Sequence, residues 1–274
     1  MSPEPSKSIF ITGGAGGMGQ ATARLFAEKG WLVGVFDVDE ERLSKLQSEL
    51  GAENCISMHL DVTDEAEFRE AIAAFGARTD GKMDILFNNA GIAPGSWFEE
   101  MPMELVRKLV DINVMGVVIG TRLALPLLRE TEGSLWLSTS SSAATFAQPM
   151  RALYSATKYA VKGLTEALGL EFERFGIRTA DLLPGCIDTP MLRNALGQRD
   201  GVEVVDDPGA LLPKEGPFRL MPATAIAEAA WSAYHSTARA HWYVPEDVED
   251  IDRLKATDFA AARRQIKQMF GTGD

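Results

Sequence analysis

Cysteine and histidine are scarce in this sequence. Among 274 residues there are two cysteines, Cys55 and Cys186, and three histidines. Two cysteines cannot build the disulfide framework of a small secreted domain, and neither belongs to a CxxC pair. With so few thiol and imidazole groups, we expect no built-in zinc site. We interpret both cysteines as small, buried apolar side chains.

Positive charge is scarce as well, and the formal net charge is −12. A nucleic-acid-binding protein normally presents a basic face, so we expect no nucleic-acid partner. An acidic protein partner is also disfavoured, because like charges repel on approach.

Long apolar runs are missing. The longest ones are broken by charged residues or glycine, so we expect no membrane span. The start, MSPEPSKSIFITGG, has an apolar run that is too short and wrongly flanked for a signal peptide. These absences predict a soluble, cytoplasmic protein.

What the chain does have is an alternation of strand-like and helix-like segments. Apolar runs typical of strands occur at 8–12, 31–37, 55–61, 83–91, 133–140, 177–185 and 241–245. Helical patterns occupy 20–30, 39–50, 64–76, 103–128 and 151–175. Near-continuous apolar strands predict a parallel sheet covered on both faces. We therefore predict an α/β fold, a single doubly wound, Rossmann-like sheet of about seven strands, in one domain over residues 1–274.

Two segments fit this alternation poorly. Residues 191–221 are irregular and rich in proline, glycine and aspartate, and a connection of this length predicts a lid over a substrate. Residues 247–274 have the pattern of a charged helical extension at the surface, and the sequence leaves its role open.

A glycine-rich loop follows the first predicted strand. It contains Gly13, Gly14, Gly16, Gly17 and Gly19 and leads into a helix. Glycines here let backbone N–H groups approach a pyrophosphate at the positive end of that helix. A plain tight turn would use the same residues, but the strand–loop–helix context favours dinucleotide binding. A P-loop is excluded, because no Gly-Lys-Ser/Thr closes the segment.

Asp37 ends the second predicted strand. A carboxylate there can accept hydrogen bonds from the ribose hydroxyls of an adenosine, and it can also cap the next helix. A 2′-phosphate would meet its negative charge, and the neighbours Val38, Asp39, Glu40 and Glu41 offer no cation. We predict NAD rather than NADP as the cofactor.

The segment YSATK places Tyr154 and Lys158 four residues apart, on one face of a predicted helix. Taken alone, such a pair is usually an exposed surface pair. With Ser141 upstream and the glycine loop in the same chain, it indicates a phenol held beside a cation. The cation would favour the phenolate, so that the tyrosine can exchange a proton near neutral pH. The rival pair, Tyr159 and Lys162, is three residues apart and has no serine at a matching distance.

Several motifs together resemble the short-chain dehydrogenase/reductase family. They are TGGAGGMG (residues 12–19), NNAG (88–91), Ser141, YSATK and the pair Pro184-Gly185, in the family's order. The resemblance covers the chain up to residue 190 and the last predicted strand. Met18 replaces the isoleucine that the family often has, and we expect no change of function from it.

The resemblance implies catalytic roles. Tyr154 would donate or accept the proton, Lys158 would lower the pKa of that tyrosine and bind the nicotinamide ribose, and Ser141 would orient the substrate oxygen. Asn113 would support a water-linked proton path to the lysine. The adjacent serines compete for the serine role, and the spacing to Tyr154 selects Ser141.

The resemblance also implies the cofactor contacts. The glycine loop and the acidic end of the second strand are two of these contacts. Residues 61–62 would meet the adenine, and residues 89–91 would lie against the adenosine ribose. Residues around 184–189 would contact the nicotinamide carboxamide. The implied set is Gly13, Gly17, Met18, Gly19, Asp37, Asp61, Val62, Asn89, Ala90, Gly91, Tyr154, Lys158, Pro184, Gly185, Ile187 and Thr189.

The substrate would lie beyond the fourth, fifth and sixth strands, where open parallel sheets place ligands. Trp97, Phe146, Met150, Met191 and Leu192 are candidates for an apolar lining, and each could instead pack the lid. We expect a small, mainly apolar secondary alcohol or ketone, such as a steroid or an aromatic alcohol. A 3-oxoacyl reductase acting on a carrier protein and a non-catalytic NAD-binding sensor are the alternatives.

Self-association is a further expectation. Family members often pair the helix around 103–128 and the helix that carries the tyrosine. The second of these has more apolar residues than one side of a sheet needs, namely Ala160, Val161, Leu164, Ala167, Leu168 and Phe172. We expect a dimer or a tetramer, with burial in the monomer core as the alternative.

Overall fold

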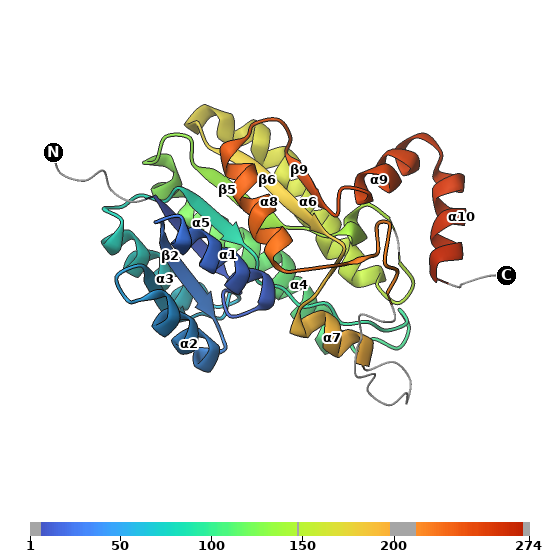
Figure 1. The fold of residues 1–274 in the computed structure, drawn as a ribbon, viewed down its shortest axis with the longest axis horizontal. Coiled ribbons are helices and arrows are strands. Elements are labelled where there is room, and N and C mark those ends of the chain that lie inside the picture. The colour runs from blue at the N-terminus through green and yellow to red at the C-terminus, as the bar shows by residue number, and fades with distance from the viewer. Residues whose placement is uncertain (1–6, 147, 198–211, 271–274) are drawn as a thin grey trace.

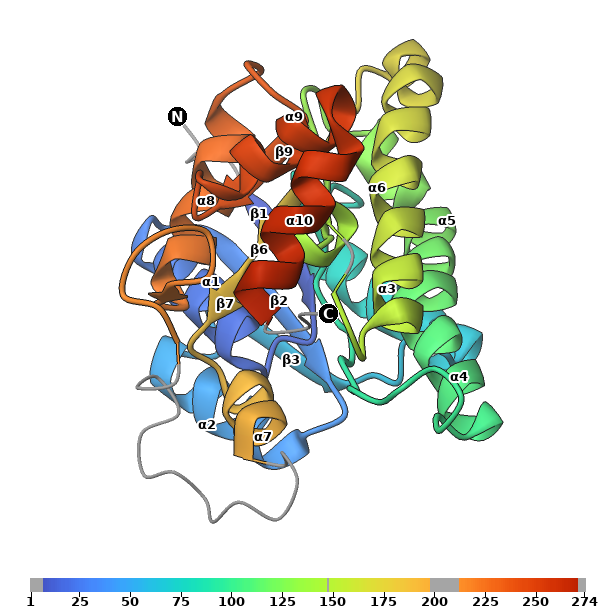
Figure 2. The same cartoon turned by 90° about the vertical axis from the view of Figure 1, so that its right-hand side faces the viewer.

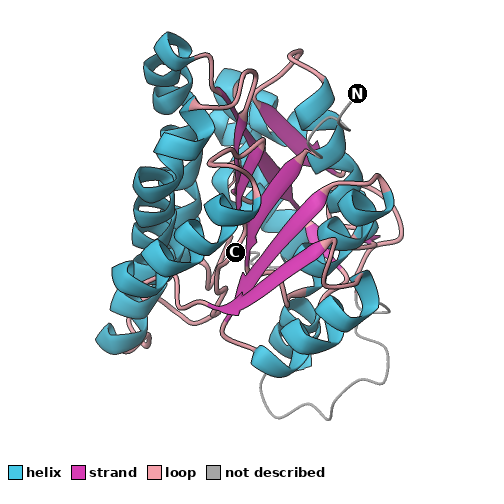
Figure 3. Ribbon diagram, turned by 90° about the vertical axis from the view of Figure 1, so that its left-hand side faces the viewer, coloured by secondary structure: helices cyan, strands magenta, loops and turns pink. Residues whose placement is uncertain are grey.

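The computed structural model describes residues 7–146, 148–197 and 212–270. Its centre is a seven-stranded sheet between two layers of helices (Figure 3). In spatial order the strands are β3 (Cys55–His59), β2 (Leu32–Asp37), β1 (Ser8–Thr12), β4 (Ile85–Asn88), β5 (Leu135–Thr139), β6 (Arg178–Pro184) and β9 (His241–Val244). All neighbouring pairs in this sheet are parallel. The prediction of a doubly wound, Rossmann-like sheet of about seven strands is confirmed.

Helices cover both faces of the sheet (Figure 1). One layer contains α1 (Gly17–Glu28), α2 (Glu40–Leu50) and α8 (Thr224–His235), and the other contains α3 (Glu65–Arg78), α5 (Gly116–Arg129) and α6 (Ala152–Phe172). Because side chains alternate along a strand, Ile9 and Ile11 of β1 pack into the first layer and Phe10 into the second.

Phe10 organises the second layer. Its ring stacks on Phe36 with centroids 3.9 Å apart, lies 6.0 Å from Phe68 and meets Phe75 edge-on at 5.4 Å. The aromatic cluster connects β1 and β2 with α3 and is fully buried. It therefore fixes the start of the sheet, from which the glycine loop leaves.

One helical stretch crosses the second layer without a break. It runs from α4 (Met103–Val110) through a π-helical turn, η1 (Asp111–Met115), into α5. By length and composition Met103–Arg129 could cross a membrane, although we expected no such segment. This is weak evidence for a membrane span, because core helices meet the same criteria; here Leu109, Val117, Ala124 and Leu128 are buried in the fold.

The segment after β6 contains elements that the sequence did not suggest. Two short parallel strands, β7 (Cys186–Ile187) and β8 (Leu220–Met221), form a second sheet, and α7 (Pro190–Gly197) follows β7. A strand of two residues is too short for an alternating apolar pattern to be recognised in the sequence. The predicted lid, residues 191–221, lies partly outside the described residues, which omit 198–211.

The C-terminal extension is helical, as predicted, but it has two helices. They are α9 (Val248–Thr257) and α10 (Phe259–Phe270). Figure 1 shows them beyond the β9 and α6 end of the molecule, with α10 standing away from the sheet. Two 3-10 turns complete the described fold: η2 (Ser142–Ala144) after β5 and η3 (Glu173–Phe175) after α6.

Candidate active site

The ends of three neighbouring strands are tied together by one asparagine. Asn89 follows β4; its side-chain amide donates to the carbonyl oxygens of Thr12 (3.0 Å) and Gly13 (3.2 Å) after β1. The hydroxyl of Thr139, at the end of β5, donates to the Asn89 side-chain oxygen (3.2 Å). The crevice that parallel strands leave at this edge is therefore held at a fixed width. Asn89 is largely a scaffold residue, although it also lines the cavity described next.

A cavity of about 420 Å³ opens over the glycine loop. It is lined by the loop, by the ends of β2 and β3, and by the segment after β4. Of the residues implied as cofactor contacts, it includes Gly13, Gly17, Met18, Asp37, Asp61, Val62, Asn89, Ala90, Gly91 and Thr189. The structure thus brings together residues from five separate parts of the chain.

The loop itself leaves no room for side chains. Gly13 has a φ of 65°, and a Cβ built on Gly19 would stand 2.2 Å from the Gly13 carbonyl oxygen. The α1 N-terminus follows directly, with Gly16 as its cap and no side chain closing it. The N–H groups of Gly14, Ala15 and Gly16 are bonded within the protein, so it is the first turn of α1, with its positive end, that can face an anion.

At the acidic end of β2, Asp37 and Asp39 have different hydrogen-bond partners. Asp37 accepts hydrogen bonds from the backbone N–H groups of Ala15 (3.0 Å) and Asp39 (3.2 Å). Asp39, not Asp37, caps α2, by accepting from the Arg42 backbone N–H. The Arg42 guanidinium also lines the cavity and pairs with Asp39 at 3.3 Å. The sequence analysis considered residues 38–41 and did not include Arg42. The i, i+3 spacing between Asp39 and Arg42 would have indicated this ion pair.

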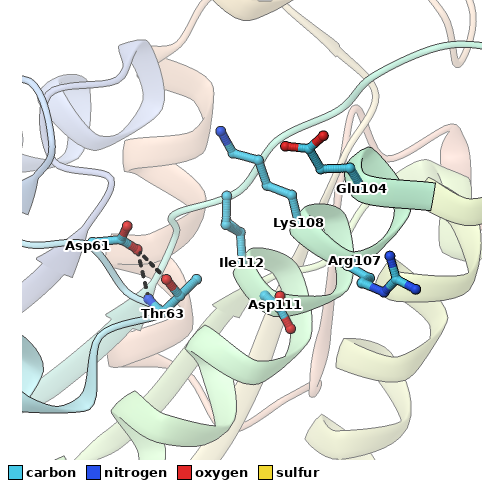
Figure 4. Close-up of a pocket in the computed structure, with 7 residues that line it drawn as sticks. All are labelled: Asp61, Thr63, Glu104, Arg107, Lys108, Asp111 and Ile112. Atoms are coloured by element: carbon cyan, nitrogen blue, oxygen red, sulfur yellow. Dashed lines mark hydrogen bonds between the residues drawn. The ribbon is translucent and has the colours of Figure 1, made fainter. Parts of the chain in front are cut away.

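A second pocket, of about 310 Å³, adjoins the first at the β3 end (Figure 4). Figure 4 shows Asp61 bonded to Thr63, across from Lys108 and Ile112 of the α4–η1 segment. The hydrogen bonds from Thr63 lower the pKa of Asp61, and the positive charges of His59 and Lys108 contribute to the same effect. Asp61 is therefore a stable carboxylate at this end of the cavity.

Ser141, Tyr154 and Lys158 meet beside the cavity. Ser141 follows β5 and accepts from the Ala143 backbone N–H (3.1 Å), whereas Tyr154 and Lys158 project from α6. The Lys158 amino group donates to the Thr139 carbonyl (2.8 Å) and lies 5.7 Å from the centre of the Tyr154 ring. A Cβ on Gly91, in the cavity wall, would be 3.5 Å from that amino group. The lysine thus connects the cavity to the tyrosine.

The direction of the Tyr154 pKa differs from our expectation. Burial raises the pKa of Tyr154, although the hydrogen bond with Ser141 and the positive charge of Arg151 oppose that rise. Burial also lowers the pKa of Lys158 to about 8. We expected Lys158 to lower the tyrosine pKa; in the protein alone, loss of water around the phenolate outweighs its neighbours.

Asn113 lies in the π-helical turn and is fully buried. Its side chain donates to the Ile92 carbonyl (2.9 Å) and the Thr157 hydroxyl (3.2 Å), and accepts from the Ile92 backbone N–H (2.9 Å). A Cβ on Gly91 would be 3.2 Å from its oxygen, so Asn113 and Lys158 flank the same glycine. The extra residue of a π-turn turns this side chain inward, a device frequent at functional sites.

The candidate substrate residues separate into two groups. Trp97 and Met191 are about half exposed, and Met150 and Leu192 are partly buried. Phe146 is fully buried in a cluster with Val248 and Ile251 of α9, so it does not line an open cleft as we expected. The reason is the C-terminal extension, whose packing the sequence did not reveal.

Two residues that the resemblance implies as nicotinamide contacts, Ile187 and Thr189, lie in the segment that follows β6. Thr189 lines the cavity, and a Cβ on Gly17 would touch its methyl group at 2.9 Å. Ile187 is buried in β7, just after Pro184 and Gly185 at the end of β6. Arg151, just before α6, donates to the Ala93 carbonyl (2.6 Å) and holds the segment after β4.

The fold and this site define a nucleotide-binding oxidoreductase. The family model described as short chain dehydrogenase matches residues 7–200. A curated relative, 2,5-dichloro-2,5-cyclohexadiene-1,4-diol dehydrogenase LinX of Sphingobium indicum, is 37% identical over 191 residues, 69% of this chain and 76% of the relative. The chain belongs to the short-chain dehydrogenase/reductase family.

Solved structures agree with this assignment. Levodione reductase superposes with a TM-score of 0.79 at 30% identity, over 87% of this chain and 95% of that one. The 3-ketoacyl-(acyl-carrier-protein) reductase of Brucella melitensis, solved with NADH, gives a TM-score of 0.74 at 29% identity, over 87% and 96%.

We predict that Gly19→Ala weakens NADH binding at least about tenfold, because the new Cβ cannot fit beside the Gly13 carbonyl and the loop must move. A fluorescence titration with NADH measures this. Gly163→Ala in α6 is the matched control, since a Cβ there meets nothing within 4 Å. Equal NADH affinity in Gly19→Ala and the parent would refute the role of the loop.

Proposed function

We propose that this protein is an NAD-dependent oxidoreductase that interconverts a mainly apolar secondary alcohol, such as a steroid or an aromatic alcohol, and its ketone. One observation carries the proposal: the Lys158 amino group lies between the wall of the nucleotide cavity at Gly91 and the ring of Tyr154. Tyr154, which would exchange the proton, thus lies next to the place where the nicotinamide end of a bound dinucleotide would be.

The residues present fit NAD. The glycine loop leaves a cradle that a Cβ would fill, the helix N-terminus above it suits a pyrophosphate, and Asp37 presents a carboxylate to an adenosine ribose. Lys158 would hold the nicotinamide ribose, and Ile187 and Thr189 the carboxamide. Bound NAD supplies the hydride acceptor or donor and, when oxidised, a positive charge near the phenol.

The chain's own residues handle the proton. In oxidation, Ser141 donates a hydrogen bond to the substrate oxygen, and the Tyr154 oxygen takes the hydroxyl proton as the C–H electron pair leaves. Because burial raises the Tyr154 pKa, the phenol needs additional positive charge to become a base. In reduction the same phenol returns the proton. Asn113 keeps the backbone next to Lys158 in place, which suits a proton path leading away from the lysine.

The substrate class follows from the exposed apolar side chains. Trp97, Met150, Met191 and Leu192 lie on segments after β4, β5 and β6 and would form an apolar lining. The lid predicted over residues 191–221 falls partly outside the described residues. A carrier-bound 3-oxoacyl substrate is the second candidate, favoured by the likeness to the Brucella enzyme. The net charge of −12 disfavours it, because carrier proteins are acidic. A non-catalytic sensor is disfavoured, because the serine, tyrosine and lysine are all present.

We also propose that the protein works in the cytoplasm, where its two free cysteines, Cys55 and Cys186, would stay reduced. Turnover of a panel of secondary alcohols with NAD, followed by absorbance, tests the function as a whole.

Replacing Tyr154 by Phe should reduce turnover by about 10²- to 10⁴-fold, the usual contribution of a general acid–base. NADH binding should stay within about twofold of the parent, because the ring is retained. Tyr234→Phe, a phenol in the opposite helix layer, is the control and should turn over normally. Substantial turnover by Tyr154→Phe would remove the proposed role.

The parent should bind NADH at least about tenfold more tightly than NADPH, since a 2′-phosphate would meet Asp37 and Asp39 while Arg42 is already paired. Asp37→Asn should reduce that ratio. Asp258→Asn, which keeps the cap of α10 and lies on the C-terminal extension outside the residues that line the cavity, should not. Isothermal titration with both reduced coenzymes measures the ratio, and a parent that prefers NADPH would contradict the assignment.

We propose a dimer or tetramer formed through α4–α5 and α6. Met103, Val110 and Met115 on the first stretch and Leu170 on α6 are exposed, Leu170 by 76%. Sedimentation of the parent should show a species larger than 29.8 kDa. Leu170→Glu should shift it toward the monomer, whereas Phe259→Glu, an equally exposed change on α10, should not. A monomeric parent would be the contrary result.

A further inference from the structure

The C-terminal extension contacts both elements that carry the catalytic residues. It lies outside residues 7–200, which the family model matches. Figure 2 shows α9 and α10 between α8 and α6 in that view, and the contacts below place α9 against α6 and against the loop after β5.

The apolar side of α9 holds the loop that follows Ser141. Val248 is fully buried, Ile251 is 2% exposed, and both pack in one cluster with Phe146. The Phe146 ring also meets Phe218 edge-on, with centroids 5.1 Å apart. Phe146 is connected back to the serine loop through its backbone N–H, which donates to the Ser142 carbonyl (3.3 Å).

The polar side of α9 holds the helix of Tyr154 and Lys158. Lys162, one turn beyond Lys158 in α6, pairs with Asp252 at 2.5 Å, and both side chains are mostly buried. Asp252 also accepts from the Tyr243 hydroxyl (2.9 Å). Lys255 donates to the Tyr159 hydroxyl (2.6 Å), so two residues of α9, about one turn apart, bind α6.

We propose that α9 is a brace that sets the position of the Ser141 loop relative to α6, with Ile251 and Asp252 as positioning residues for the Ser141–Tyr154 pair. The proposal rests on the proposed function. A helix that packs its apolar side against one element, and that is joined to the other by an ion pair and a hydrogen bond, limits how far the two can separate. Since Ser141 and Tyr154 must reach the same substrate oxygen, small displacements of either reduce the rate.

The brace should affect turnover without affecting coenzyme binding, because the residues of α9 do not line the nucleotide cavity. Asp252→Asn removes the charge that holds Lys162 and keeps the shape of the side chain. The matched control is Asp250→Asn, the same change on an exposed position of the same helix. Circular dichroism and melting curves verify that each variant is folded.

The first measurement is the separation of kcat from coenzyme affinity. We expect kcat of Asp252→Asn to decrease about tenfold while the Kd for NADH stays within about twofold, and Asp250→Asn to match the parent in both. A general loss of structure would instead weaken NADH binding as well. Equal kcat in Asp252→Asn and the parent, or an equal loss in Asp250→Asn, would overturn the proposal.

The second measurement does not depend on turnover. The chain has four tyrosines, so ¹⁹F NMR of protein labelled with 3-fluorotyrosine gives four resonances, assigned with Tyr→Phe variants. In Asp252→Asn the Tyr243 signal must shift, because its hydrogen-bond acceptor has changed, and Tyr234 must not. A shift of Tyr154 supports the brace; a Tyr154 signal unchanged while Tyr243 shifts overturns it.

These outcomes are distinct from failure of the proposed function. A parent that binds no NADH and oxidises no alcohol would refute the function, whereas the fluorine spectra would still test the brace. If Asp252→Asn does not fold, Tyr243→Phe removes only the hydroxyl that donates to Asp252. It should give the same effects at a smaller size, and a Tyr243→Phe variant with parental kcat and an unshifted Tyr154 signal would overturn the proposal.

Discussion

The hydrogen bonds of Asn89 are the constraint on which the rest of the site depends. They tie the carboxyl ends of β1, β4 and β5 together, and each of these strands then delivers a different part of the site. The glycine loop leaves β1, the segment with Gly91 leaves β4, and Ser141 follows β5. Parallel strands place all their carboxyl ends at one edge, so a single bonded asparagine can fix three loops relative to one another.

The same arrangement explains the electrostatics. Lys158 reaches this edge from α6 and donates to the carbonyl of Thr139, the residue whose hydroxyl binds Asn89. Its amino group is thereby buried, which lowers its pKa to about 8, while burial of Tyr154 raises the pKa of the phenol. Both changes disfavour charge. Positive charge brought by a ligand would lower the pKa of the Tyr154 phenol and also lower the pKa of the Lys158 ammonium further, so it would favour the phenolate.

The C-terminal helices add a third hydrophobic core to the fold. Phe146, Val248 and Ile251 form a core of their own, separate from the two cores that flank the sheet. This small core joins the loop that follows Ser141 to α9, so the packing of the extension bears on that loop. This part of the chain lies beyond residues 7–200, which the family model matches.

The sequence by itself predicted the seven strands of the central sheet and the helices α1 to α6, because apolar periodicity is a local signal. It did not predict β7, β8, α7 or α8. The motif residues followed from the resemblance to the family. The sequence also indicated the tyrosine, lysine and serine, whose spacing along the chain is their signature. Only the tertiary structure decided the burial of Phe146 under α9, the pairing of Arg42 with Asp39 and the direction of the Tyr154 pKa. Each of these depends on what a side chain meets in space. Contacts between residues 146 and 251, or desolvation of a phenol, leave no periodic trace in the sequence.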